Sequence, residues 1–176
     1  MKSEVEAVAG PTIVVRSIHP SDQLGLRAFH HRLSDDTVRN RYFGSHPVLS
    51  VSEALRLTTL TPGSETALVA TAGERIVGVG RSIRLGEGDA AEVAFVVADG
   101  YQHNGIGTEL LTLLARLGWG DGIRRFVADT FATNTAMLYV FRHSPGAVTV
   151  LTTERDGSVV HLVMAITPPT AMLAAG

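Results

Sequence analysis

The feature that most constrains this chain is an apolar run joined through a glycine-containing turn to an apolar, helix-favouring stretch. Residues 91–98 form the apolar run, Gly105 and Gly107 lie in the turn, and we predict a helix over residues 108–119. Glycine has no Cβ, so the backbone can approach a ligand closely, and the first N–H groups of a helix have no partner within it. We therefore predict that an anion, a phosphate or pyrophosphate, binds the amides of residues 103–108.

Two well-known phosphate motifs do not fit this stretch. In a P-loop, the last glycine is followed by a lysine and then by Ser or Thr. Here Thr108 follows Gly107 directly, with no lysine between them. A dinucleotide fingerprint needs a third glycine where Leu110 stands. The remaining pattern is Gln-x-x-Gly-x-Gly, from Gln102 to Gly107. An ordinary tight turn can also contain Gly-x-Gly, so the surrounding elements must decide its meaning.

Hydrophobic periodicity and turn residues predict an alternating series of strands and helices. A capping box at residues 50–53 opens one helix, and Asp156 and Gly157 join the last two strands as a hairpin. The predicted strands cover residues 12–18, 67–71, 76–83, 91–98, 125–132, 148–154 and 159–166, and the predicted helices follow residues 20–22, 34–36, 50, 107 and 134. Leu24, Leu26, Phe29, His30 and Leu33 form the apolar stripe of the first helix.

Composition limits the domain count and the class of partner. A chain of 176 residues with 45% hydrophobic content fits one globular domain, which we place at residues 12–167 between a leader (1–11) and a tail (168–176). The net charge of -2 argues against nucleic acid or an anionic membrane as partner. The first ten residues lack an apolar segment, so we expect neither a signal peptide nor a membrane anchor and predict a cytoplasmic protein.

Cysteine is absent from the sequence, which excludes thiolate metal ligands and a cysteine nucleophile. His30 and His31 are adjacent, yet no carboxylate pair stands at ligand spacing beside them, so we predict no metal.

The Gln102–Gly107 pattern resembles the acyl-CoA pyrophosphate loop of the GNAT superfamily of N-acetyltransferases, and the order of elements is similar to that family over residues 12–166. The resemblance implies an α/β (α+β) fold: a central mixed, mostly antiparallel twisted sheet of about seven strands, flanked by about four helices. It also implies acetyl-CoA as cosubstrate and direct transfer to an amine, with a backbone N–H near Val97 polarising the thioester. The cofactor-binding residues that it implies are Phe95, Val96, Val97, Gln102, His103, Asn104, Gly105, Ile106, Gly107, Thr108, Asn134, Met137 and Phe141.

Residues 32–43, which begin Arg-Leu-Ser, and residues 91–95 resemble the bacterial Pat-type protein lysine acetyltransferases. That group carries a glutamate on the fourth strand as general base, which implies Glu92 for this role and a protein lysine as acceptor. A lysine ammonium, with a reference pKa of about 10.4, must lose a proton before it attacks. Apolar neighbours can raise a carboxylate pKa toward the working range, which suits Glu92, although a surface glutamate at the start of a strand is the alternative.

Other readings stay open at this stage. Many GNAT enzymes have a tyrosine seven residues after the Asn as general acid, but Phe141 stands there; Tyr139 lies on another helical face and is predicted to pack. Asn134 can cap a helix, lie near the pantetheine arm, or do both. The acceptor can also be a small amine, such as an amino acid, polyamine or aminoglycoside, and the chain can be a catalytically silent acyl-CoA-binding module. A homodimer is left open.

Overall fold

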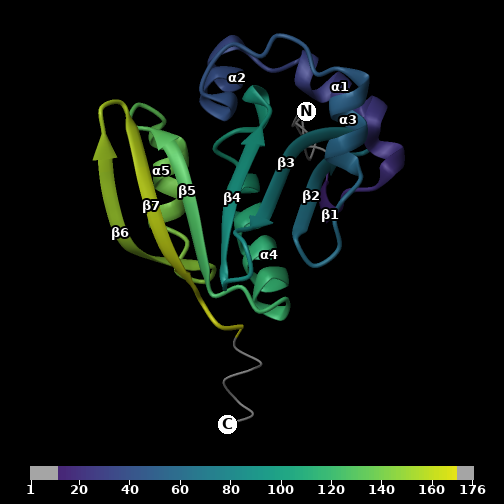
Figure 1. Ribbon diagram of the computed structural model, residues 1–176. Helices are drawn as coiled ribbons and strands as arrows, with labels where there is room; N and C mark the ends of the chain where they lie inside the picture. The colour runs from purple at the N-terminus through teal and green to yellow at the C-terminus, as the bar shows by residue number, and fades with distance from the viewer. Residues whose placement is uncertain (1–11, 170–176) are drawn as a thin grey trace, which may run out of the picture.

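The computed structural model describes residues 12–169, which form one seven-stranded sheet with helices on both faces (Figure 1). The strands are β1 (Ile13–Ser17), β2 (Glu65–Ala72), β3 (Arg75–Arg84), β4 (Ala90–Val97), β5 (Arg125–Phe131), β6 (Val148–Asp156) and β7 (Val159–Ile166). The α-helices are α1 (Gln23–His31), α2 (Asp35–Tyr42), α3 (Val51–Thr58), α4 (Ile106–Gly120) and α5 (Thr135–Arg142), with 3-10 turns η1 (Pro20–Asp22) and η2 (Asp99–Tyr101). The predicted leader, residues 1–11, and residues 170–176 of the predicted tail lie outside the described residues.

The strand order is β1-β2-β3-β4-β5-β7-β6, and the β4–β5 pair is parallel while the other neighbours are antiparallel. A parallel pair needs a crossover connection, and α4 supplies it between β4 and β5. The predicted mixed, mostly antiparallel sheet and the order of its elements are therefore confirmed. The described residues contain five α-helices, as the periodicity predicted, where the family resemblance implied about four.

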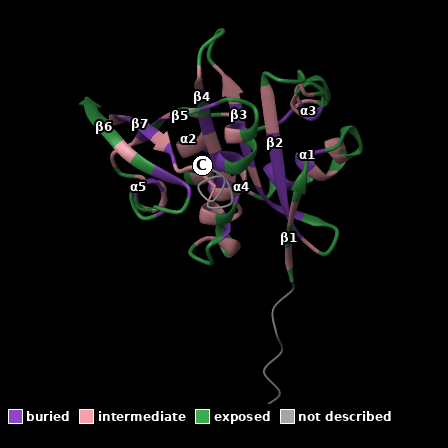
Figure 2. Ribbon diagram, turned by 90° about the horizontal axis from the view of Figure 1, so that it is seen from below, coloured by how far each residue is buried: buried purple, intermediate pink, exposed green. Residues whose placement is uncertain are grey.

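Two hydrophobic cores lie on opposite faces of the sheet. On β2, Leu68 and Ala70 pack toward α4 and α5, whereas Ala67 and Val69 pack toward α1 and α3. This alternation follows from the two-residue period of a strand. Figure 2 shows the buried residues concentrated in β2, β3 and β4, and exposed residues along β6.

Small residues on β3 set the position of α4. A Cβ built on Gly78 would lie 3.1 Å from Ile106 Cγ2, and one on Gly80 would lie 3.1 Å from Leu114 Cδ1. The two glycines therefore let α4 pack closely against β3, both at its first residue, Ile106, and two turns later at Leu114.

The two halves of the sheet separate beyond a short seam. β4 pairs with β5 only from Ala90–Arg125 to Glu92–Val127, three residue pairs, while β3 pairs with β4 as far as Val97. In Figure 1 the two strands diverge from this seam toward α2. The last part of β4 thus has a paired neighbour on one side alone.

Several helix boundaries agree with the sequence prediction, since Ser34 and Asn134 cap α2 and α5 and Ser50 and Glu53 form the capping box of α3. Two details were wrong. Helix α4 begins at Ile106 rather than Thr108, because Gly105 takes the N-cap position with φ of 80°. Leu24 is 77% exposed and does not belong to the α1 core stripe.

No helix within residues 12–169 combines the length and the apolar character needed to cross a bilayer.

Candidate active site

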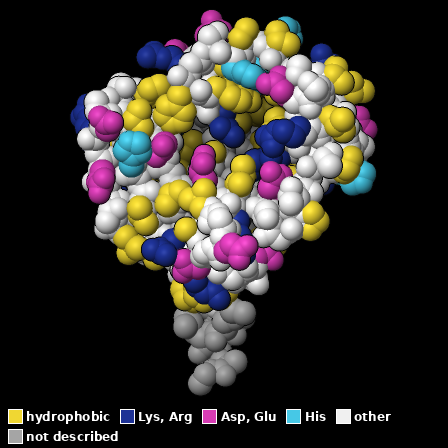
Figure 3. All heavy atoms as spheres, in the orientation of Figure 1, with side chains coloured by type: hydrophobic (Ala, Val, Ile, Leu, Met, Phe, Trp, Pro, Cys, Tyr) yellow, Lys and Arg dark blue, Asp and Glu magenta, His cyan; other side chains and the backbone are white. Residues whose placement is uncertain are grey.

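A cavity of about 740 Å³ lies where β4 and β5 diverge, between α2 on one side and α4 and α5 on the other. Figure 3 looks onto this face and shows a hollow bordered by arginine, acidic and hydrophobic side chains. Every predicted site residue lines the cavity except Asn104. The residues that the prediction did not include are Thr37, Asn40, Arg41, Phe43, Val93, Ala94, Tyr101, Asp129, Thr130, Thr135, Ala136, Tyr139 and Val140.

The glycine-containing turn presents main-chain donors to this cavity. The backbone turns through positive φ at His103 (61°) and Gly105 (80°). The first helical bond of α4 runs from the Glu109 N–H to the Gly105 carbonyl, so the amides of residues 106–108 precede the helical ladder. A Cβ on Gly105 would meet no atom within 4 Å, whereas one on Gly107 would lie 3.2 Å from Phe95 Cε2. Gly107 thus lets the turn pack against Phe95, and the first amides of α4 have no partner within the helix, as an anion site at a helix N-terminus requires.

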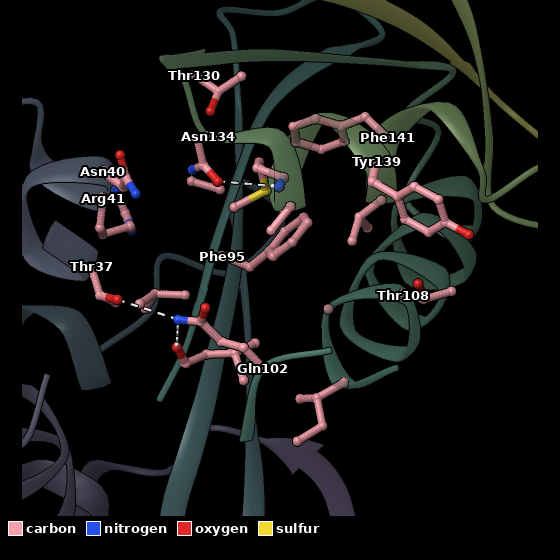
Figure 4. Close-up of a pocket in the computed structure, with 18 of the residues that line it drawn as sticks. Thr37, Asn40, Arg41, Phe95, Gln102, Thr108, Thr130, Asn134, Tyr139 and Phe141 are labelled. Atoms are coloured by element: carbon pink, nitrogen blue, oxygen red, sulfur yellow. Dashed lines mark hydrogen bonds between the residues drawn. The ribbon is translucent and has the colours of Figure 1, made fainter. Parts of the chain in front are cut away.

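Three side chains of the turn hold its conformation by hydrogen bonds or by packing in the core. The Gln102 amide donates to the Val97 carbonyl at 3.0 Å and to Thr37 Oγ1 at 3.2 Å, as Figure 4 shows. Asn104 donates to the Gln102 carbonyl, and Ile106 is 4% exposed within the core. The turn can therefore offer an anion its backbone N–H groups and the exposed His103 side chain.

The inner edge of β4 offers further backbone donors. The Ala98 N–H points to β3, where it bonds the Val77 carbonyl at 2.8 Å. Amide directions alternate along a strand, so the N–H groups of Phe95 and Val97 point the other way, toward the space that β5 has left. The Val97 carbonyl faces the same space and accepts from Gln102. The predicted donor near Val97 is therefore oriented into the cavity.

The opposite wall consists of β5 and α5. Asn134 Oδ1 accepts from the Met137 N–H at 3.2 Å, which makes Asn134 an N-cap that also lines the cavity. Thr130 is buried, and its Oγ1 has no hydrogen-bond partner within the described chain although it borders the cavity. An unsatisfied hydroxyl at this place suits a ligand with polar groups along its length.

Phe141 and Tyr139 differ sharply in position. Phe141 is 2% exposed and its ring meets Phe95 edge to face, with centroids 5.5 Å apart. Tyr139 is 63% exposed and stacks on His143 with ring centroids 4.2 Å apart, so its packing contact lies at the surface. Figure 4 shows its hydroxyl turned away from Phe95 and Asn134.

Glu92 lies at the end of the β4–β5 seam and borders the cavity, but it is exposed. The apolar environment expected from its sequence neighbours is absent around it, because Val93 and Phe95 point to the opposite face of the strand. Asp129 on β5 also borders the cavity, and its Oδ1 lies 2.7 Å from His161 Nδ1. The sequence prediction missed Asp129 because only the strand register brings it near Glu92.

Helix α2 is held over the cavity by Asp99. The Ser34 N–H and hydroxyl and the Thr37 hydroxyl all donate to this carboxylate, at 3.0, 2.6 and 2.7 Å. Burial alone would raise the pKa of Asp99, but these hydrogen bonds outweigh it and hold the pKa below its usual value. The same link places Asn40 and Arg41 at the rim of the cavity.

Comparison with known proteins gives a consistent result. Residues 28–144 match the model of the acetyltransferase (GNAT) family. The chain is similar to the GNAT domain of S. lividans PAT, with 31% identity over 86% of this chain and 89% of that one and a TM-score of 0.77. Ribosomal-protein-alanine N-acetyltransferase from Brucella melitensis (20% identity, 88% and 99% covered, TM-score 0.67) and PaiA N-acetyltransferase from Thermoplasma acidophilum in complex with coenzyme A (17%, 86% and 98%, 0.66) share the fold.

Proposed function

The chain belongs to the acetyltransferase (GNAT) family, and from that premise we propose that it transfers acetyl groups from acetyl-CoA to the side-chain amine of protein lysines. Acetyl-CoA-dependent N-acetylation follows from the family. The choice of lysine is supported by residues 32–43, the segment that resembles Pat-type enzymes. This segment includes α2, and Asp99 ties α2 to the rim of the cavity.

The residues present fit acetyl-CoA. The amides of residues 106–108 would hold the pyrophosphate, and Asn134, Met137 and Thr130 would border the pantetheine arm. The N–H groups of Phe95 and Val97 point to where a thioester carbonyl would lie, and a backbone donor there stabilises the oxyanion as it forms. Acetyl-CoA itself supplies the activated acyl group.

Glu92 is proposed to take the proton from the acceptor ammonium. Its exposed carboxylate stands on the same wall as the edge of β4 and is open to an acceptor that arrives from the α2 side. Direct attack needs no acyl-enzyme, which agrees with the absence of cysteine from the sequence. A leaving thiolate, with a thiol pKa near 8.5, departs without a strong acid, so Phe141 in place of tyrosine is compatible with turnover.

Two other functions are distinguished from this one by simple observations. Acetylation of small amines in preference to proteins would make the acceptor an amino acid, polyamine or aminoglycoside. Binding of acetyl-CoA without turnover of any amine would make the chain an acyl-CoA-binding module, which the missing tyrosine permits.

The test is release of free thiol from acetyl-CoA against matched panels of proteins, lysine peptides and small amines. We expect faster turnover with lysine-containing proteins or peptides than with polyamines or aminoglycosides. Mass spectrometry locates the acetyl group, and the enzyme contributes little background because Lys2 is its only lysine. Turnover confined to small amines would overturn the choice of acceptor.

A further inference from the structure

A second, smaller pocket of about 40 Å³ lies under α1, α2 and α3, on the acceptor side of the sheet. Arg41, Ala94 and Val96 border both this pocket and the large cavity, so the two are neighbours. The polar side chains around the small pocket are His30, Arg41, Tyr42 and Arg81, and the remaining wall is hydrocarbon: Ile18, Leu26, Phe29, Leu33, Leu49, Leu57, Val79, Ala94 and Val96. No Asp or Glu is among these lining residues.

Arg81 is a buried cation with incomplete compensation. It is 6% exposed, and one end of its guanidinium donates to the Leu57 carbonyl. Its other nitrogen, Nη1, makes no hydrogen bond within residues 12–169, and the nearest carboxylate oxygen, on Glu65, stands 3.6 Å away. Burial lowers the pKa of Arg81, and Glu65 offsets this only in part. A further anion at this place would be stabilised.

His30 contributes a second unsatisfied nitrogen. It is 4% exposed, and its Nε2 has no hydrogen-bond partner among the described residues. Its ring is held edge-on by Tyr42 and His46, with centroids 5.6 and 5.4 Å away. Two side chains that are more than nine-tenths buried thus border one pocket, each with a nitrogen that makes no hydrogen bond within the described residues; the Arg81 nitrogen has in addition a 3.6 Å ion pair with Glu65, which does not line the pocket.

We propose that this pocket binds a carboxylate that belongs to the acceptor molecule. The donors are guanidinium, imidazole and phenol groups, which match a carboxylate in charge and in hydrogen bonding. One water molecule needs about 10–15 Å³ of cavity volume. The pocket, at about 40 Å³, therefore has room for a group of two or three heavy atoms. A carboxylate held there would place its own molecule beside Ala94 and Val96, on the strand that faces the thioester.

The proposal rests on the proposed function and refines it: the preferred acceptor is an amine with a carboxylate close by. That carboxylate comes either from an acidic side chain next to a protein lysine or from a free amino acid. Paired substrates separate these sources. One pair consists of peptides that carry Asp or Asn beside the lysine, and the other of L-lysine and cadaverine, which is lysine without its carboxylate.

We expect the wild type to favour the carboxylate member of one pair in kcat/KM by about 10- to 100-fold, the range of one charge-assisted hydrogen bond. Arg81→Gln should remove the preference and leave the rate with the neutral member little changed. Arg56→Gln is the matched control, because Arg56 lies 3.9 Å from Glu65 on the exposed side and does not line the pocket. Equal rates with both members of both pairs in the wild type would overturn the proposal and leave water as the occupant.

Two further measurements keep the test informative if Arg81→Gln fails to fold. His30→Leu should reduce the same preference, because leucine fills a similar volume but has no nitrogen that could bond the carboxylate. Propionate should inhibit wild type in competition with the acceptor and not with acetyl-CoA, and should raise its melting temperature; competition with acetyl-CoA alone would contradict the pocket. The melting measurement does not depend on turnover. If propionate stabilises the protein but no amine is acetylated, the proposed function is refuted and the pocket is not.

Discussion

The two walls of the active site are made of different chemical groups. On the α4 side, backbone N–H groups of residues 106–108 and of Phe95 and Val97 face the cavity, the Gln102 and Asn104 side chains bond to the chain, and the His103 side chain is exposed. On the α2 side, the polar groups that line the cavity are side chains, among them Glu92, Asp129 and Arg41. The backbone wall depends on main-chain geometry, so a side chain added at Gly105 or Gly107 would disturb it. The side-chain wall can change its specificity one substitution at a time.

The largest effect is expected from a side chain placed in the backbone wall. In Gly105→Glu and Gly107→Glu, bulk and negative charge enter the pyrophosphate site, and at Gly107 the new Cβ would also lie 3.2 Å from the Phe95 ring. Losing two charge-assisted hydrogen bonds at about 1.5 kcal/mol or more each implies a drop of at least 100-fold in CoA affinity. Calorimetry with CoA measures it.

Gly120→Ala is the control for these variants, because a Cβ at that place, near the other end of α4, would meet no atom within 4 Å. It should bind CoA as wild type does. Unchanged affinity in both glutamate variants would show that the pyrophosphate lies elsewhere.

The next largest effect is expected on the side-chain wall, from Glu92→Gln. Loss of a general base costs roughly 10²- to 10⁴-fold in kcat, and CoA affinity should hardly change because the backbone wall is untouched. The residual rate should climb as pH rises and the acceptor amine loses its proton to solvent. Steady-state kinetics across pH, with CoA binding in parallel, measure both.

Asp129→Asn provides a comparison for Glu92, since Asp129 is a second exposed carboxylate beside the cavity. We expect a smaller loss than in Glu92→Gln. If Asp129→Asn loses more activity than Glu92→Gln, the proton acceptor is the Asp129–His161 pair, and Glu92 only borders the site.

A moderate effect on stability should follow when the link between the two walls is weakened by Asp99→Asn. The three hydrogen bonds from Ser34 and Thr37 lose their charged acceptor, at a cost of about 1 kcal/mol after allowance for the exposure of Asp99. For a domain of this size, that lowers the melting temperature by roughly 2 to 4 °C. Thermal unfolding at neutral pH measures it.

The same variant has a defined pH dependence. The folded pKa of Asp99 is depressed, so its stabilising contribution is present above the unfolded value of about 3.9 and is lost as pH falls through the folded pKa. The difference in stability between wild type and Asp99→Asn should therefore shrink toward low pH. A difference that stays constant below pH 4 would mean that the asparagine amide, not the lost charge, causes the destabilisation.

The smallest effect is expected from Tyr139→Phe, which should leave kcat within about twofold of wild type, because its hydroxyl points away from Phe95 and Asn134. A loss of tenfold or more in kcat, with normal CoA binding, would instead make Tyr139 the general acid.

Local patterns in the sequence predicted the backbone wall well. The order of strands, the helix caps at Ser34, Ser50 and Asn134, and the turn at Gly105 all depend on residues a few positions apart. Even there, the start of α4 was misplaced by two residues, because Gly105, with positive φ and no side chain to signal a cap, is the N-cap.

The side-chain wall was harder to predict because its members meet through tertiary packing. The exposure of Glu92 depends on which face of β4 it occupies, and apolar neighbours in sequence do not decide that. Asp129 comes near Glu92 through the register of two strands 30 or more residues apart. Arg81 and His30, from β3 and α1, meet at one pocket that no motif indicates.

Because β4 and β5 pair over only three residues, the last part of β4 is an unpaired strand edge in the middle of the sheet. Edge strands invite other chains to pair with them, and proteins commonly protect their outer edges against such aggregation. Here the exposed ladder groups lie inside a cavity covered by α2 and α5, and the Gln102 amide occupies the Val97 carbonyl. A narrow, extended molecule with its own amide groups would complete the ladder, so the same geometry that keeps this edge from pairing with other chains would suit the pantetheine arm of the acetyl-CoA that we propose as cosubstrate.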